Sequence, residues 1–205
     1  MSAGNTAKLN LMALMQEKFN SQVHSQWHTQ GFEYYRAIWI ECAELIDHYG
    51  WKWWKHQELD LNQVKLELVD IWHFGLSDLI RAGKEEDAAQ AFDRADVDAE
   101  NFCLAVEAFA HDTLTTRRFS ATAFGTVLAS LPMSFDELFD LYVGKNVLNK
   151  FRQDHGYKSG EYKKVWAGRE DNEHLVELLA GLDVQVERIP TELYALLLSR
   201  YQDAR

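Results

Sequence analysis

The spacing of hydrophobic residues along the chain is helical almost throughout. Apolar side chains recur every three or four positions, and the strict alternation typical of strands is nearly absent. A capping box, Ser134 followed three residues later by Glu137, marks one helix start. The pattern predicts an all-α helical bundle, with helices over 7–24, 33–49, 60–82, 86–110, 120–130, 134–152, 159–166, 171–181 and 190–203.

Four acidic residues interrupt the apolar stripes of the second and third predicted helices. Glu41 and Glu44 are three residues apart on one helix, and Glu67 and Asp70 are three apart on the next. Residues three apart lie on one face of a helix, so each pair shares the face of its apolar neighbours. An ionised carboxylate is stable in such a place only when a cation accompanies it.

The two acidic faces are expected to meet, because a connection of about ten residues, 50–60, makes the helices antiparallel neighbours. Four converging carboxylates favour a hard divalent cation, with Mg²⁺ as the first choice. The alternative is a pair of solvated acidic helix faces, since the spacing Glu-x-x-Asp/Glu recurs elsewhere in the chain.

Composition narrows the possible functions. The 205 residues, of which 47% are hydrophobic, can form one core, and we expect one domain over 1–205. A net charge of −11 argues against nucleic-acid or membrane-surface binding. Cys42 and Cys103 are isolated in apolar helical patterns, as in a reducing compartment. The sequence shows neither a signal peptide nor a membrane-spanning stretch, so we expect a cytoplasmic protein.

A basic segment follows the acidic helices. Residues 145–169 carry seven Lys and Arg residues against two acidic ones. Within it, the stretch 154–162 contains two glycines, which let backbone N–H groups approach a phosphate. Acids that bind a metal, combined with lysines and arginines, are typical of a site for a polyphosphate bridged to Mg²⁺. The alternative is that these basic residues only make the C-terminal helices more polar.

Several blocks of the sequence resemble the dimeric all-α dUTP pyrophosphatases, which belong with the MazG-like all-α nucleoside triphosphate pyrophosphatases. The resemblance covers about residues 9–175 in blocks. These blocks are Glu41-x-x-Glu44, Trp51-Lys52-Trp53-Trp54-Lys55, Glu67-Leu68-Val69-Asp70-Ile71-Trp72-His73-Phe74, Lys145 to Asp154, Gly156 to Lys163, and Trp166-x-Gly168-x-Glu170-Asp171-Asn172. Residues 84–130 match none of them and are expected to be a variable helical insertion.

The resemblance implies a fold and a reaction. The fold would be a homodimeric helical bundle in which Glu41, Glu44, Glu67 and Asp70 bind Mg²⁺. The reaction would be attack of water on the α-phosphate of dUTP, giving dUMP and pyrophosphate, with dUDP as a further candidate substrate. A glutamate would accept the proton of the water; we expect Glu41, with Glu44 one turn away as the second candidate.

The resemblance also implies residues that bind the substrate. Gln16 and Asn20, four apart on the first helix, would recognise uracil, because carboxamides match the donors and acceptors of its imide edge. The alternative is a helix with two polar surface residues. His73 would lie near the nucleoside, or would be a hydrogen-bonded core histidine. The remaining candidates are Asn149 for the sugar, Asn172 in the C-terminal block, and the phosphate ligands Lys55, Arg152, Lys158, Tyr162 and Lys163.

The tryptophans of the 51–55 block could stack on the base, although packing in the core is the usual role of such a group. Three other readings of the chain remain. The first is a MazG-like pyrophosphatase of relaxed base specificity. The second is a di-iron carboxylate bundle, which would need Glu-x-x-His pairs that this sequence lacks. The third is a non-enzymatic helical interaction protein.

Overall fold

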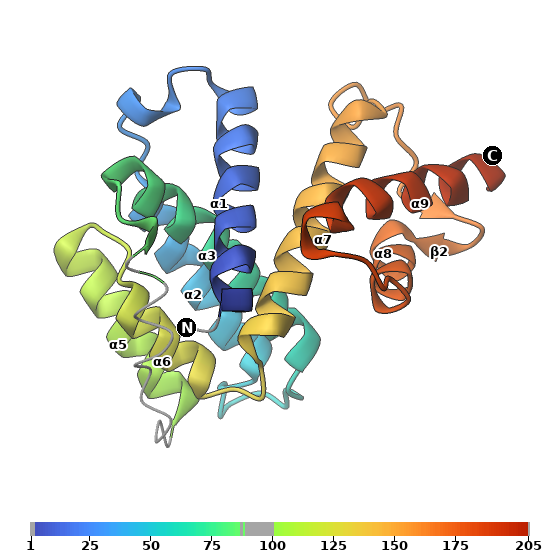
Figure 1. Ribbon diagram of the computed structural model, residues 1–205. Coiled ribbons are helices and arrows are strands. Elements are labelled where there is room, and N and C mark those ends of the chain that lie inside the picture. The colour runs from blue at the N-terminus through green and yellow to red at the C-terminus, as the bar shows by residue number, and fades with distance from the viewer. Residues whose placement is uncertain (1–2, 87, 89–100, 205) are drawn as a thin grey trace. The chain divides into compact units, whose positions relative to one another are not determined.

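The computed structural model describes residues 3–86, 88 and 101–204. The described residues are mostly helical, which confirms the all-α prediction (Figure 1). The α-helices are α1 (Ala3–Val23), α2 (Tyr34–Tyr49), α3 (Leu61–Ala82), α5 (Phe102–Thr116), α6 (Ala121–Ala129), α7 (Phe135–Asp154), α8 (Asp171–Ala180) and α9 (Ile189–Asp203). The short elements are the 3₁₀ turns η1 (Trp27–Thr29) and η2 (Val186–Arg188) and the strands β1 (Val165–Trp166) and β2 (Arg169–Glu170).

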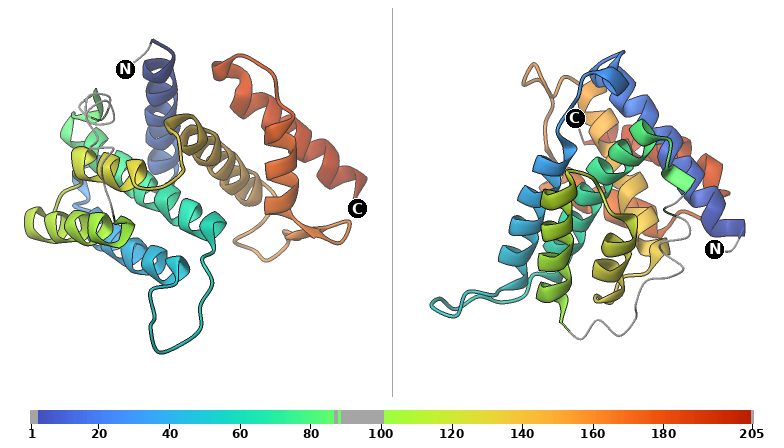
Figure 2. Two further views of the ribbon diagram at one scale, coloured as in Figure 1. Left: turned by 90° about the horizontal axis from the view of Figure 1, so that it is seen from below. Right: turned by 90° about the vertical axis from the view of Figure 1, so that its left-hand side faces the viewer.

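The chain forms two compact units, residues 1–138 and 139–205. In the first unit, α2 and α3 run antiparallel and pack along each other, as the short connection predicts (Figure 2). The side of α2 that carries Ile38, Cys42 and Leu45 is buried, as are Val64 and Leu68 on α3. This packing brings the acid-bearing faces of the two helices together. The assignment of one domain to 1–205 remains a prediction.

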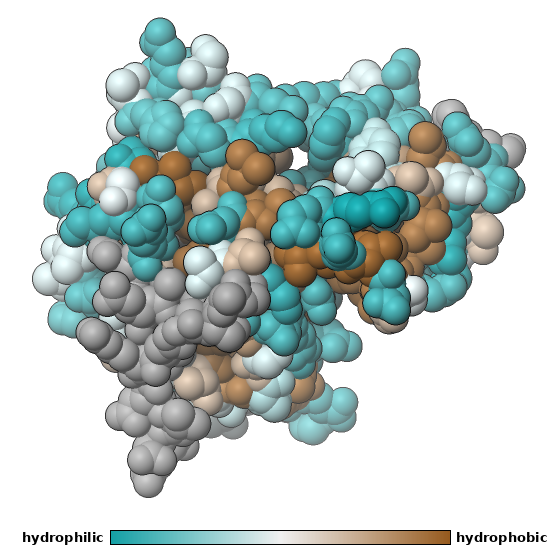
Figure 3. All heavy atoms as spheres, viewed as in Figure 1, coloured by the Kyte–Doolittle hydropathy of each residue, from teal (hydrophilic) through white to brown (hydrophobic). Residues whose placement is uncertain are grey.

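The second unit contains α8, α9 and most of α7, together with the β1–β2 hairpin. Its core is aromatic: Phe151, Trp166 and Tyr201 are almost completely buried and contact one another. Apolar side chains also reach its surface, including Val176 on α8 and Leu196 on α9. Figure 3 shows hydrophobic side chains among polar ones on one face of the molecule.

Two helix predictions are wrong in whole or in part. Residues 159–166 are not a helix: Gly156 and Gly160 have positive φ angles, and the N–H groups of Glu161 and Tyr162 donate to the Gly156 carbonyl in a tight turn. A two-stranded hairpin follows. The helix predicted over 86–110 is not continuous: residues 86 and 88 are helical, but Asn101 is extended and its side chain caps a helix that begins at Phe102. Residues 89–100 of that prediction, and of the 84–130 insertion, lie outside the described residues.

Other local predictions are confirmed. The Ser134 hydroxyl accepts a hydrogen bond of 3.1 Å from the Glu137 backbone N–H, as expected of a capping residue. Cys42 is buried and Cys103 is partly buried, and both are free thiols. Among the described residues, we find no helix with the length and apolar character that crossing a bilayer requires.

Gly75 sets how closely α3 packs against the aromatic cluster of the first unit. A Cβ atom added at Gly75 would lie 2.5 Å from the ring of Phe119, which itself packs on Trp72 and Phe124. We therefore expect Gly75→Ala to destabilise the protein by about 1–3 kcal/mol through overpacking, despite the better helix propensity of alanine. Urea unfolding measures this loss. The double variant Gly75→Ala/Phe119→Leu should recover part of it, and strictly additive effects would contradict the predicted clash.

Candidate metal and nucleotide site

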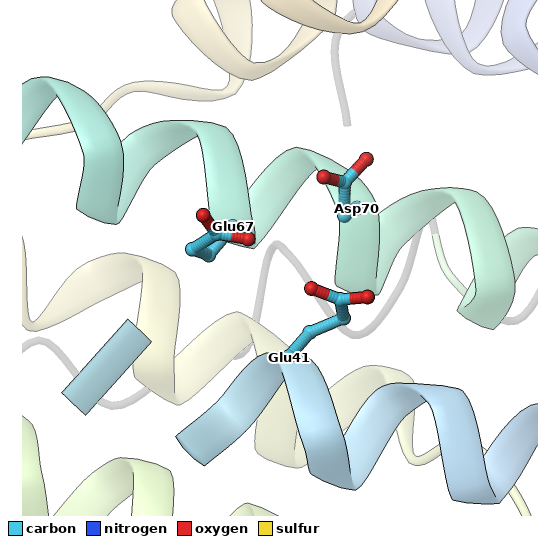
Figure 4. Close-up of side chains that lie close together, drawn as sticks. All are labelled: Glu41, Glu67 and Asp70. Carbon is cyan, nitrogen blue, oxygen red and sulfur yellow. The ribbon is translucent and has the colours of Figure 1, made fainter. Parts of the chain in front are cut away.

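Three of the four predicted acids converge between α2 and α3. Glu41 extends from α2 toward Glu67 and Asp70 on α3 (Figure 4). One carboxylate oxygen of each residue lies within 4.8 Å of the others. Glu67 is buried, while Glu41 and Asp70 are half-buried. The solvated-face alternative is therefore wrong for these three side chains.

The convergence raises the affinity of the cluster for positive charge. Burial, the negative charge of Asp70 and a hydrogen bond with Glu67 raise the pKa of Glu41 from 4.5 to about 7. At neutral pH, a proton therefore partly neutralises the cluster. An all-oxygen donor set with this much negative charge is what hard divalent cations bind best, so the cluster can bind a metal ion.

Glu44 does not join the three converging acids. It is exposed and lines an open pocket with Trp39, His48 and Trp51. Its charge still contributes to the raised pKa of Glu41, as the smallest of five causes. His48 was not predicted as a site residue, yet its Nε2 lies 3.6 Å from a carboxylate oxygen of Glu67.

A buried polar network joins α1 to α3. Gln16 and Asn20 on α1 are only 3% and 7% exposed, so the alternative of two polar surface residues is wrong. The Gln16 Nε2 group donates to Asn20 Oδ1 (3.1 Å) and to Ser77 Oγ (3.0 Å). Asn20 Nδ2 donates to the same hydroxyl at 2.9 Å. On the other side, His73 Nδ1 lies 2.9 Å from Gln16 Oε1.

In the second unit, the buried carboxylate of Asp171 accepts hydrogen bonds from two of the predicted phosphate ligands. Arg152 donates from Nε and Nη2 to the two oxygens of Asp171, at 2.8 and 2.9 Å. The Tyr162 hydroxyl donates to Asp171 at 2.8 Å, and burial together with this bond raises the pKa of Tyr162 far above its usual value. Asn149 and Asn172 lie at the same guanidinium group, 3.5 and 3.4 Å from its nitrogens.

The remaining predicted ligands are exposed. Lys158 lies within the glycine-containing turn of the second unit, Lys163 follows it, and Lys55 lies in the connection between α2 and α3. The backbone N–H groups of Gly160 and Glu161 donate to the Tyr157 and Gly156 carbonyls within that turn, and the N–H of Tyr157 donates to the Arg152 carbonyl near the end of α7. The glycines therefore serve to close the turn, and these N–H groups are already used.

The tryptophans of the connection do not pack in a core. Trp51, Trp53 and Trp54 are 47%, 87% and 56% exposed, so the core interpretation is wrong for all three. Their rings contact one another edge to face. A connection that runs outside the α2–α3 pair offers these side chains no interior to enter (Figure 2).

A comparison with known protein families shows to which family this chain belongs. A family model described as dUTPase matches residues 8–157, which is most of the chain and includes the three converging acids and the Gln16–Asn20 pair. The chain belongs to the all-α dUTPase family. No curated protein matches it. The matched range ends before Tyr162, Lys163 and Asn172, so this match does not cover the C-terminal block of the resemblance.

Besides His48, two residues of this dUTPase-family protein were missed by sequence reasoning. Ser77 is 1% exposed and accepts hydrogen bonds from both predicted base-recognition residues. Asp171 is completely buried and orients Arg152 and Tyr162. A signal for Ser77 existed, because a polar residue on an apolar helix face is the same anomaly that reveals the acids.

Proposed function

We propose that the protein is a Mg²⁺-dependent dUTP pyrophosphatase, which hydrolyses dUTP to dUMP and pyrophosphate. Its family is one of nucleotide pyrophosphatases. The observation that carries the proposal is the convergence of Glu41, Glu67 and Asp70 from two tightly packed helices. Such a cluster of oxygen ligands suits Mg²⁺, which commonly bridges protein carboxylates and substrate phosphates.

The carboxylates have distinct proposed roles. Glu67 and Asp70, both on α3, would hold Mg²⁺ together with Glu41, and Glu44 remains proposed as a fourth ligand one turn along α2. The chemistry that Mg²⁺ supplies when bound is neutralisation of the negative charge on phosphate oxygens. Glu41 is half-buried, and its carboxylate lies close to the carboxylates of both α3 acids, so the same cation could contact all three.

Glu41 is also the proposed general base. Its carboxylate would accept a proton from water while the water oxygen bonds to the α-phosphorus, and the bond from that phosphorus to the bridging oxygen breaks to release pyrophosphate. Glu44 remains the second candidate for this role.

The buried network of α1 and α3 is the proposed reader of the base. Uracil presents an N3–H donor beside an O4 acceptor, whereas cytosine presents an N3 acceptor beside an N4 donor. Gln16 and Asn20 carry amide groups whose direction is fixed by hydrogen bonds, as such discrimination requires. His73 is the proposed third member, since it contacts Gln16.

Phosphate binding, sugar binding and assembly remain proposals that rest on the family resemblance. They concern the lysines Lys55, Lys158 and Lys163, the asparagines Asn149 and Asn172, and the pair Arg152 and Tyr162. The bonds of Arg152 and Tyr162 to Asp171 support a role in shaping the second unit beside any contact with phosphate. A homodimer and dUDP hydrolysis are proposed on the same grounds, and a cytoplasmic location is proposed from the sequence composition.

A screen of nucleoside triphosphates tests the function. With Mg²⁺, kcat/KM for dUTP should exceed that for dCTP by roughly tenfold to a hundredfold. The N4 donor of cytosine would face a donor of the protein, and each hydrogen-bonding group left unsatisfied costs about 1–3 kcal/mol. Chelation of the metal should abolish turnover. Equal hydrolysis of all pyrimidine and purine triphosphates would favour the MazG-like enzyme of relaxed specificity, and no hydrolysis of any would favour the interaction protein.

A further inference from the structure

Ser77 occupies the centre of the buried network. It lies on α3 one turn after His73, and its hydroxyl donates to the His73 carbonyl at 2.9 Å. The same oxygen accepts N–H groups from Gln16 (3.0 Å) and Asn20 (2.9 Å). A hydroxyl has one proton and two lone pairs, so it can donate to the carbonyl and accept from both amides. The side chain of Tyr34 on α2 also forms a hydrogen bond with Ser77.

The bond to the His73 carbonyl determines which way both amides face. A carbonyl can only accept, so Ser77 is the donor in the bond to His73. With its proton on that side, its oxygen accepts from Gln16 and Asn20. Gln16 and Asn20 therefore have to present their NH₂ groups to Ser77. If either amide rotated by 180°, its carbonyl oxygen would face the lone pairs of the hydroxyl, which is repulsive.

The fixed amide direction extends to the imidazole. With its Nε2 turned toward Ser77, Gln16 directs Oε1 at Nδ1 of His73, 2.9 Å away. An amide oxygen is an acceptor, so Nδ1 of the neutral imidazole must carry the proton. One serine hydroxyl thus sets the direction of two amides and the tautomer of one histidine.

We propose that Ser77 is the positioning residue that makes this network specific for uracil; the inference rests on the proposed function. An amide that can rotate presents either a carbonyl or an NH₂ group, and so matches uracil and cytosine equally well. An amide held in one direction matches only one of them. Ser77 acts through Gln16 and Asn20 and need not touch the base itself.

The test compares dUTP and dCTP hydrolysis in Ser77→Ala. Loss of the hydroxyl should lower the ratio of kcat/KM for dUTP over dCTP by roughly tenfold, mainly through a gain with dCTP. Ser77→Thr restores a hydroxyl and should restore the ratio. The matched control is Thr113→Val, which removes a buried hydroxyl of the first unit that has no hydrogen-bond partner among the described residues, and should leave the ratio unchanged.

Thermal unfolding must show that each variant is folded; if Ser77→Ala is not, Ser77→Cys replaces it, since a thiol is a poor hydrogen-bond partner of similar size. A selective wild type with an equally selective, folded Ser77→Ala would overturn the inference while leaving the proposed function intact. A wild type that hydrolyses dUTP and dCTP equally would overturn the proposed uracil specificity, and the claim for Ser77 with it.

Nitrogen-15 NMR of the imidazole gives a readout independent of turnover. It should show the Nδ1–H tautomer of His73 in the wild type and a mixture of tautomers in Ser77→Ala. An identical tautomer in both proteins would show that Ser77 does not orient the network. This measurement therefore separates a failure of the positioning role from a failure of the proposed reaction.

Discussion

Glu67→Gln is expected to lower kcat/KM for dUTP by at least about a hundredfold while the protein stays folded. Glu67 is the most buried of the three converging acids, and an amide at this place would bind Mg²⁺ far more weakly. The lost charge stabilisation of the transition state amounts to several kcal/mol, and each 1.4 kcal/mol is a factor of ten in rate. Steady-state kinetics at saturating Mg²⁺ measure the effect.

The stability of the metal-free protein should not fall when Glu67 is replaced by Gln. The charge of Glu67 helps to raise the pKa of Glu41, so removing it relieves repulsion and should leave the apo protein as stable as the wild type or more stable. Mg²⁺ should raise the unfolding temperature of the wild type more than that of the variant. Glu58→Gln, at an exposed acid of the α2–α3 connection, is the control. Full activity in Glu67→Gln would refute the metal assignment.

Arg152→Ala is expected to destabilise the protein by about 3–5 kcal/mol, because it would leave the buried carboxylate of Asp171 without its guanidinium partner. Asp171 is completely buried, and Arg152 contacts both of its oxygens. The Tyr162 hydroxyl would still donate to it. Chemical denaturation measures the loss, which must be known before any change in KM of this variant is attributed to phosphate binding.

A surface ion pair in the second unit provides the control for Arg152→Ala. Arg169 contacts Glu177 at 2.7 Å, but both side chains are about half exposed, so Arg169→Ala should destabilise the protein far less than Arg152→Ala. Adding Asp171→Asn to Arg152→Ala should recover part of the stability, since an amide tolerates burial better than an unpaired charge. Equal effects of Arg152→Ala and Arg169→Ala would contradict a special role for the buried pair.

The acids could be predicted from the sequence, although only three of the four converge. Charge on an apolar stripe is a local anomaly, and the short connection implies that α2 and α3 are neighbours. Residues three apart, however, differ by about 60° around a helix. Glu41 therefore faces α3, whereas Glu44 turns toward solvent. The width of an apolar stripe does not reveal this difference.

The hydrogen bonds of the network could not be predicted. Gln16 and Ser77 are 61 positions apart, and the sequence of either helix does not indicate which partner its polar side chain will meet. Their meeting depends on how α1 packs on α3, which no local pattern specifies. Two wrong predictions about loops have a similar origin. The helix predicted over 159–166 does not form because Gly156 and Gly160 adopt positive φ angles. The tryptophans predicted to be in the core are exposed because their connection runs outside the packed helices.

Hydrolysis of dUTP in ¹⁸O-labelled water with Mg²⁺ tests the central claim most directly. The proposed mechanism forms a bond from water to the α-phosphorus, so phosphorus-31 NMR should show the isotope shift on dUMP and unlabelled pyrophosphate. Glu41→Gln should reduce formation of the labelled dUMP, because the proposed base lies in the acid cluster. Label in pyrophosphate, or release of dUDP and orthophosphate, would contradict the proposed reaction.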